Sequence, residues 1–197
     1  MQYVFGYAPV KLSDVASYSS VRVNAANVDK SNYVGVDNLL QNKQGKMTAS
    51  YVPTNGTVIG YNAKDILIGN IRPYLKKIWF SDGEGGTNGD VLVIRAKDFG
   101  IVYPRYLYFV LSSDSFFSYD NQNAKGTKMP RGNKDAVMGY AFAIPSIEEQ
   151  KAISALLDGF DSYCNDMEEG LPAEIEARQK QYEYYRDKLL NMKRLEV

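Results

Sequence analysis

The chain has 197 residues, 45% of them hydrophobic, and its 23 basic and 23 acidic residues give a formal net charge of zero. This length and composition indicate one moderate globular domain with an appendage. No run approaches the roughly 18 apolar residues of a membrane span, and the N-terminal segment lacks the basic and apolar regions of a signal peptide, so we expect a cytoplasmic protein with no membrane partner.

Histidine is absent from the sequence. Its absence excludes Ser-His-Asp and Cys-His nucleophile systems, an imidazole general base and His-ligated zinc. An enzyme that uses carboxylates stays open as an alternative, with Asp82, Glu84 and Asp90 of the glycine-rich stretch 81–90 as candidates. Acidic residues among glycines more often form a solvated turn, and the spacing matches neither a P-loop nor an EF-hand. We therefore expect no catalytic residue and no metal site.

The first part of the chain contains short β-branched or aromatic runs that are bounded by Gly, Asn, Pro or Asp, the pattern of β-strands. These runs are residues 31–36, 65–69, 77–80 and 90–95. Residues 12–15 predict the start of a short helix with Ser13 as its N-cap, and 104–113 predict a packed helix behind a proline at its first turn. Residues 1–146, called the head below, are thus expected to form a mixed, mostly β domain.

Charge is distributed unevenly along the chain. Residues 147–197, called the arm below, contain 7 of the 23 basic and 12 of the 23 acidic residues, which leaves 16 and 11 in the head. The head is therefore basic and the arm acidic. A basic head favours a polyanionic partner such as nucleic acid.

Two segments concentrate the basic residues of the head. Residues 123–134 contain four cations and no acid, and residues 61–80 contain Lys64 and three further cations beside Asp65 alone. Interleaved with Asn, Thr and Gly, such cations can bind phosphates and present hydrogen-bonding groups to base edges. The candidate DNA-contacting residues are Lys125, Thr127, Lys128, Arg131, Asn133 and Lys134, then Arg72, Lys76 and Lys77, and the polar loop residues Asn38, Gln41, Asn42 and Lys43. A solvated loop is the alternative for these segments, and a structural role is the alternative for Arg72.

The arm has the pattern of a long coiled coil. Ser146 and Glu149 have the spacing of a capping box behind Pro145, which predicts a helix start near Ser146. Positions of one helix face then recur at steps of three and four. They are Ile153, Leu157, Phe160, Cys164, Met167, Leu171, Ile175, Arg178, Tyr182, Tyr185, Leu189 and Met192. Gly170 and Pro172 flank a slip in this register, which predicts two helices or one sharply kinked helix.

Such a helix face must be buried against something. The two halves of the arm could fold back as a hairpin or pair with another chain. The connector of one or two residues is short for a hairpin, although glycine and proline make a tight turn possible, so we favour pairing with a second copy or with a partner subunit. Arg178 and the tyrosines make the seam polar, as in seams that set register and partner choice. A scaffold or adaptor whose arm binds one protein and whose head binds another is the alternative to a DNA reader.

The sequence resembles a known family at several points. Residues 144–153, 156–158 and 170–190 are similar to the helical spacer region of specificity subunits of type I restriction-modification systems, and residues 10–15, 69–73 and 126–133 resemble landmarks of their target recognition domain. The resemblance implies an α+β, non-enzymatic subunit with a DNA target recognition domain at 1–146 and a helical spacer or dimerisation arm at 147–197.

The same resemblance implies the partners. Double-stranded DNA would bind to the head, methyltransferase subunits that carry S-adenosylmethionine would dock on the arm, and a restriction subunit would join the assembly. The chain itself would bind no cofactor. Family members generally contain two recognition domains and two helical regions, whereas this chain has one of each, so it looks like a half-subunit. We therefore expect a homodimer through the arm that recognises an interrupted palindrome.

Overall fold

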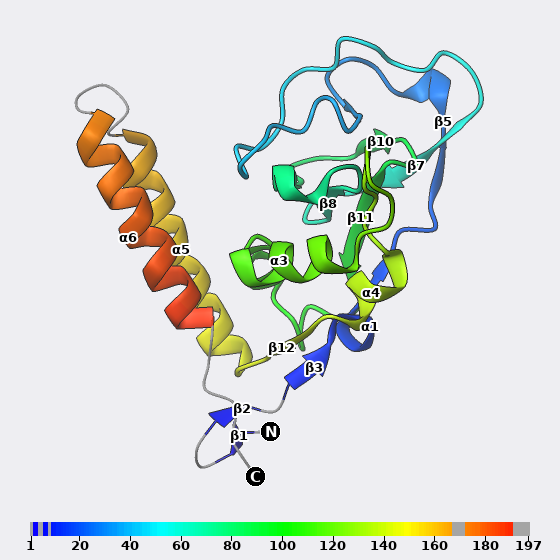
Figure 1. Ribbon diagram of the computed structural model, residues 1–197. Coiled ribbons are helices and arrows are strands. Elements are labelled where there is room, and N and C mark those ends of the chain that lie inside the picture. The colour runs from blue at the N-terminus through cyan, green and yellow to red at the C-terminus, as the bar shows by residue number, and fades with distance from the viewer. Residues whose placement is uncertain (1, 4–5, 8, 167–171, 191–197) are drawn as a thin grey trace.

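The computed structural model describes residues 2–3, 6–7, 9–166 and 172–190, and divides them between a mixed head and two long helices (Figure 1). This arrangement confirms the predicted fold class. Within the described ranges, no helix has the length and hydrophobicity that crossing a lipid bilayer requires.

Two four-stranded sheets form the β part of the head. The first has the order β4 (Ala16–Tyr18), β11 (Val91–Ala96), β8 (Ile66–Gly69) and β9 (Ile78–Phe80), with antiparallel neighbours throughout. The second has the order β5 (Arg22–Asn24), β7 (Thr57–Tyr61), β10 (Gly85–Thr87) and β6 (Tyr33–Val34), in which only the last pair is parallel. The predicted strands are all present, although 31–36 is reduced to two residues of β6.

Two short ribbons complete the strands. They pair β12 (Ala141–Ala143) with β3 (Pro9–Lys11), and β1 (Gln2–Tyr3) with β2 (Gly6–Tyr7). The first ribbon lies where the chain leaves the head, so it joins the beginning of the head to the entrance of the arm (Figure 1).

Four α-helices and two short 3-10 helices belong to the head. They are α1 (Leu12–Val15), α2 (Pro104–Leu111), α3 (Asp114–Asn123), α4 (Lys134–Gly139), η1 (Ala25–Asn27) and η2 (Pro73–Leu75). The predicted helix at 104–113 is confirmed as α2. The prediction of Ser13 as an N-cap is wrong: α1 begins at Leu12, and the Asp14 carboxylate accepts a hydrogen bond from the backbone N–H of Lys11 at 3.1 Å.

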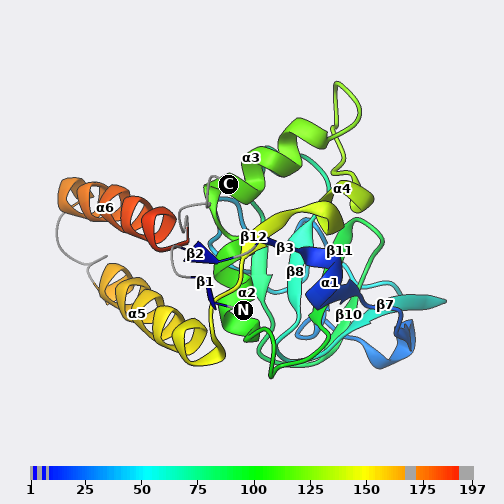
Figure 2. The same cartoon turned by 90° about the horizontal axis from the view of Figure 1, so that it is seen from below.

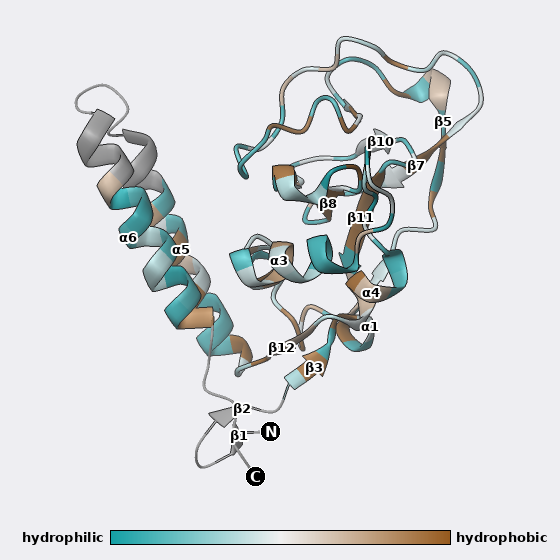
Figure 3. Cartoon of the chain, in the orientation of Figure 1, coloured by the Kyte–Doolittle hydropathy of each residue, from teal (hydrophilic) through white to brown (hydrophobic). Residues whose placement is uncertain are grey.

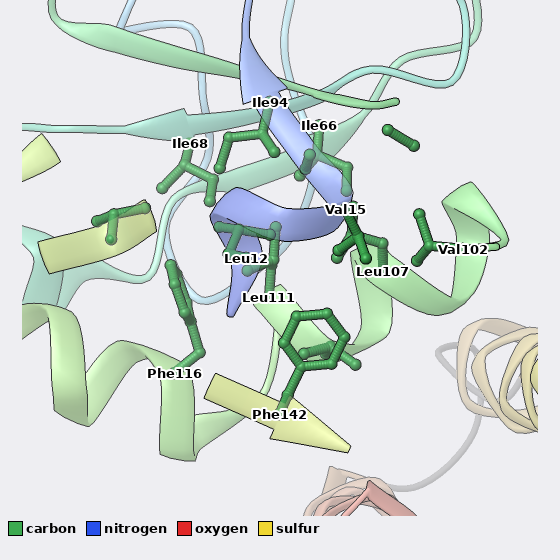
Figure 4. Packing of buried hydrophobic residues seen from close by; sticks show 14 of the residues in the cluster. Leu12, Val15, Ile66, Ile68, Ile94, Val102, Leu107, Leu111, Phe116 and Phe142 are labelled. Carbon is green, nitrogen blue, oxygen red and sulfur yellow. The ribbon is translucent and has the colours of Figure 1, made fainter. Parts of the chain in front are cut away.

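The main hydrophobic core lies between the first sheet and the helices of the head (Figure 4). The core residues labelled in Figure 4 are Leu12, Val15, Ile66, Ile68, Ile94, Val102, Leu107, Leu111, Phe116 and Phe142. Strand β8 is buried along its whole length, which explains its continuous apolar sequence. The core therefore fixes α2 and α3 against the sheet, and these two helices carry the contacts to the arm and to the basic loops.

The arm folds back on itself. Helices α5 (Ile147–Asp166) and α6 (Pro172–Leu190) lie side by side in both Figure 1 and Figure 2, and the rings of Phe160 and Tyr182 meet at 6.4 Å between centroids. Ile153 and Leu190 pack against the main core of the head. Of the two arrangements that the sequence left open, the structure shows the hairpin, and the favoured pairing with a second copy or a partner subunit stays a prediction.

The start of the arm was predicted correctly. Ser146 and Glu149 form the capping box, with Ser146 N–H donating to Glu149 Oε2 at 3.0 Å and Glu149 N–H donating to Ser146 Oγ at 3.4 Å. Leu157 is fully buried, whereas Phe160, Arg178 and Tyr185 are exposed and Tyr182 and Leu189 are half-buried. Most of the described part of α6 is hydrophilic (Figure 3). The predicted positions Met167, Leu171 and Met192, and the side chains of Cys164 and Ile175, lie outside the described residues.

Candidate nucleic-acid interface

Three segments that are far apart in the sequence meet on one side of the head; we call them the three basic loops, residues 38–46, 70–77 and 124–133. The first joins the second through backbone hydrogen bonds from Asn42 N–H to Leu75 O and from Lys43 N–H to Lys76 O, both 2.9 Å. The second joins the third through the 2.7 Å bond from Arg72 N–H to Pro130 O. The three loops that carry most of the candidate residues predicted from sequence are thus connected to one another.

The backbone of these loops is held in an uncommon conformation. Asn42, Lys43, Arg72 and Lys76 have φ values of 54°, 65°, 54° and 49°, in the left-handed region that costs a non-glycine residue free energy. Among the described residues, only Lys64 joins them as a non-glycine residue with positive φ. Such strain persists only where the surrounding contacts hold it, so the loops are shaped by the fold and not by their local sequence.

The third basic loop has a closed base and an exposed tip. Lys125 and Arg131 exchange two backbone hydrogen bonds of 2.9 Å, so that residues 126–130 project from between α3 and α4 (Figure 2). Gly126 turns the chain with a φ of 96°. Lys125, Thr127 and Lys128 are exposed, and within the described residues their side chains have no ion pair. The tip therefore presents cations and a hydroxyl to solvent.

Other cationic side chains of the surface differ in how they are held. Arg72 is exposed and makes no ion pair within the described ranges, whereas Arg131 pairs with Asp90 at 3.1 Å while remaining 61% exposed. The Lys134 side chain is exposed; its backbone carbonyl accepts a hydrogen bond from the Tyr18 hydroxyl at 2.9 Å. These groups remain accessible to a phosphate.

Several predicted contact residues already have intramolecular partners. Asn38 is buried and its Oδ1 accepts a hydrogen bond from Gly35 N–H at 2.9 Å, and Lys77 Nζ donates to Val36 O at 2.7 Å. Asn133 caps α4, because its Oδ1 accepts hydrogen bonds from the backbone N–H groups of Asp135 at 3.1 Å and Ala136 at 3.4 Å. These side chains shape the loops.

Lys43 and Lys76 share one partner that sequence reasoning missed. Both ammonium groups donate to Asp114 Oδ1, at 2.9 Å and 2.7 Å. Burial raises the pKa of Asp114, but the hydrogen bonds from Lys76 and Lys43 outweigh it and lower that pKa to about 2. Asp114 therefore stays ionised between two lysines, each from a different loop. No sequence spacing links the three residues.

A buried polar pair lies beneath the third basic loop. Asp120 of α3 is 1% exposed and Asn70 is 5% exposed, and Asn70 Oδ1 and both carboxylate oxygens of Asp120 accept no hydrogen bond within the described residues. A Cβ added to Gly132 would lie 2.7 Å from Asn70 Oδ1 and from Asp120 Oδ1. Burial raises the pKa of Asp120 to about 6. The backbone at Gly132 therefore needs glycine to approach this pair.

The acidic candidates for an enzyme are dispersed. Asp82 and Glu84 are exposed in the turn before β10, and Asp90 pairs with Arg131. In the part of the chain that the structure describes, no three acidic, cysteine or histidine side chains gather as a metal ion would need. The described loops thus offer cations for an anionic ligand.

Residues 6–177 match the family described as the type I restriction modification DNA specificity domain. The chain belongs to this family. The resemblance drawn from sequence is thereby confirmed. Specificity subunits of this family are non-catalytic components of type I restriction-modification complexes and bind no cofactor; S-adenosylmethionine is bound by the methyltransferase subunit.

Named relatives agree with this assignment. The chain is 36% identical over 93 residues to the Escherichia coli type I restriction enzyme EcoR124I/EcoR124II specificity subunit, covering 47% of this chain and 23% of the relative. It is 29% identical over 118 residues to the type I restriction enzyme MpnII specificity subunit of Mycoplasma pneumoniae, covering 60% of this chain and 34% of the relative. The matched part thus spans only about a quarter to a third of these relatives.

Solved structures share the fold. The HsdS subunit from Thermoanaerobacter tengcongensis superposes with a TM-score of 0.63 at 20% identity, over 84% of this chain and 45% of that one. A chain from a structure that concerns complex assembly and conformational transition of the type I restriction-modification system superposes with a TM-score of 0.60 at 21% identity. This superposition covers 94% of the present chain and 48% of the other. In both cases the chain corresponds to less than half of the solved chain that it matches.

Proposed function

We propose that this protein is the DNA-reading subunit of a type I restriction-modification complex, and that its three basic loops bind one half of the target site. The observation that supports this most strongly is the union of the loops by backbone hydrogen bonds such as Arg72 N–H to Pro130 O. A rigid cationic surface can neutralise phosphates while it holds polar groups in register with the bases. Action on DNA also implies a cytoplasmic location in bacteria.

The exposed side chains supply the proposed contacts. Lys125, Lys128, Arg131 and Lys134 would neutralise phosphates, together with Arg72. The polar groups proposed to hydrogen-bond with bases or phosphates are those of Thr127 and Gln41. Asn38, Lys43, Lys76, Lys77 and Asn133 would act indirectly by shaping the loops, since their side chains are held by intramolecular partners.

The arm would dock the methyltransferase subunits, and the restriction subunit would join through them. Leu156, Phe160, Tyr184 and Tyr185 remain exposed on α5 and α6 after the hairpin has formed. Aromatic and aliphatic side chains of this kind are the usual anchors of protein interfaces. S-adenosylmethionine would be bound by the methyltransferase.

A homodimer would complete the assembly. The chain covers 45% and 48% of the solved subunits that share its fold, so two copies would match the extent of one such subunit. A twofold axis would give the two heads opposite orientations on the duplex, and the target would then be an interrupted palindrome. Arm length would set the unread spacer.

DNA binding is tested by fluorescence anisotropy with a random-sequence duplex over a series of salt concentrations, with and without the methyltransferase subunit. We expect affinity to fall linearly on a log–log plot as salt rises. Salt-independent or absent binding in both cases would favour a scaffold or adaptor instead. Turnover of the isolated chain with added metal would favour the carboxylate enzyme.

The dimer is tested separately. Sedimentation at micromolar concentration is expected to reveal a dimer, and sequencing of methylated adenines in cells that carry the system is expected to give a symmetric, interrupted site. A monomer with and without methyltransferase, or asymmetric methylation, would reject the homodimer and leave the DNA-reading role standing.

A further inference from the structure

Asp114 is the meeting point of three cations from three parts of the molecule. Lys43 comes from the first basic loop, Lys76 from the second, and Arg186 from helix α6 of the arm. Arg186 Nη2 lies 3.6 Å from Asp114 Oδ2, on the opposite oxygen from the two lysines. Figure 2 shows the N-terminal end of α3, where Asp114 is located, facing α6.

Arg186 is firmly held at this point. Its side chain is 2% exposed, donates two hydrogen bonds to Asp187 Oδ1 at 3.0 Å and 3.2 Å, and lies over the Tyr182 ring at 5.7 Å. A guanidinium so deeply buried requires acidic partners, since an uncompensated buried charge is strongly destabilising. Asp114 therefore connects the arm to the loops.

The two lysines are in a different situation from the exposed cations of the third basic loop. The side chain of Lys43 is 14% exposed and that of Lys76 is 35% exposed, and both ammonium groups pair with the same oxygen, Asp114 Oδ1. Burial lowers the pKa of Lys43, and the neighbouring charges of Arg186 and Lys76 lower it further, against the opposing effect of Asp114. Three cations packed together would repel one another without that carboxylate.

We propose that Asp114 is a positioning residue for specificity, which keeps Lys43 and Lys76 away from the DNA backbone and fixes the two loops relative to the arm. Resting on the proposed function, this assignment divides the basic residues into two groups. The exposed lysines of the third basic loop bind phosphate of any sequence, whereas the two lysines on Asp114 hold the loops in one conformation. Specificity increases because fewer cations contribute sequence-independent affinity.

The test is Asp114→Asn, which keeps the size of the side chain and removes its charge. Each cation that gains a phosphate contact steepens the slope of log affinity against log salt by about 0.9. When the two lysines no longer pair with Asp114, the slope on a random-sequence duplex is expected to steepen by about one to two. The ratio of the affinity for the sequence that the system methylates in cells to the affinity for the random duplex is expected to fall. Both are measured on the complex with the methyltransferase.

The control with the same change of charge is Asp82→Asn, because Asp82 is exposed and has no ion pair among the described residues. It is expected to leave the slope unchanged. Adding Lys43→Gln and Lys76→Gln to Asp114→Asn is expected to return the slope to that of the wild type. An unchanged slope in Asp114→Asn, or an increase that survives removal of both lysines, would overturn the assignment.

A second variant tests the proposal if Asp114→Asn does not fold. Lys43→Gln with Lys76→Gln, in the wild-type background, is expected to lower the specificity ratio without changing the slope on random duplex. A slope reduced by about two would mean that both lysines bind phosphate already, which contradicts the proposal. Failure of the proposed function would be seen differently, as absence of salt-dependent DNA binding by the wild type.

Discussion

Gln150 in the first turn of α5 is bonded to Tyr103 at the start of α2: the backbone N–H of Tyr103 donates to Gln150 Oε1 at 2.7 Å. The amide nitrogen of Gln150 donates in turn to Ile101 O at 3.0 Å and to Pro145 O at 2.9 Å. Gln150 is 0% exposed, so water cannot replace these partners. One side chain therefore fixes the direction in which the arm leaves the head.

Replacing Gln150 by Leu is expected to lower the free energy of unfolding by about 2–4 kcal/mol, because it leaves one backbone donor and two carbonyl groups without their partner. Urea unfolding measures the loss. Lys151→Ala, at the exposed neighbouring position, is the matched control and should stay within about 0.5 kcal/mol of the wild type. Equal losses in the two variants would mean that the bonds of Gln150 contribute nothing particular.

Asn133 provides a prediction about stability where the sequence suggested DNA contact. Its side chain caps α4, and loss of a cap costs about 1 kcal/mol. Asn133→Ala is thus expected to lower the thermal midpoint without altering the sequence that is methylated, and Asn133→Asp should preserve the cap and the midpoint. A relaxed methylation site in Asn133→Ala at unchanged stability would instead identify Asn133 as a base-reading residue.

Local patterns in the sequence were sufficient for β6, β8, β9, β11, α2 and the capping box, because each depends on neighbours within a few residues. The packing of the arm against the head was not predictable in this way. Arg105 of α2 forms an ion pair with Asp158 of α5 and lies 4.7 Å and 4.8 Å from the ring centres of Tyr108 and Phe109. Helical spacing predicts that Leu157 is buried, but it does not predict which part of the molecule packs against it.

The candidate site shows the same limit. Sequence composition found the basic residues of the loops, because cations without acids are visible in a single segment. It did not reveal that Lys76 is neutralised by Asp114 while Lys128 is exposed, since that difference depends on contacts across 38 residues of sequence. Nor did it find Asp120, which only the fold places beneath Gly132. Charge could be counted from sequence, whereas its pairing required the structure.

Lys128 and Lys77 should therefore behave differently when each is changed to Ala. Lys128 is exposed on the third basic loop, so its loss is expected to weaken binding to all duplexes alike and to flatten the salt slope by about 0.9. Lys77 donates to Val36 O, so its loss should reduce stability and leave the slope unchanged. Anisotropy at several salt concentrations, with urea unfolding, separates the two effects. If Lys128→Ala and Arg131→Ala both retained affinity and slope, the third basic loop would not be a DNA contact.

Asp120 makes the stability of the head depend on pH. Burial raises the pKa of Asp120 from 3.8 in the unfolded chain to about 6 in the folded one. The native state is therefore favoured while this carboxyl is protonated. That stabilisation is lost as pH rises from about 4 through 6. The difference corresponds to about 3 kcal/mol above pH 7. Asp120→Asn is therefore expected to stabilise the protein by up to that amount at pH 7.5, with a gain that shrinks as the pH falls. Urea unfolding between pH 5 and 8 measures it. Asp82→Asn is the exposed control, and a gain for Asp120→Asn that stayed constant over this range would show that the buried carboxyl does not titrate there.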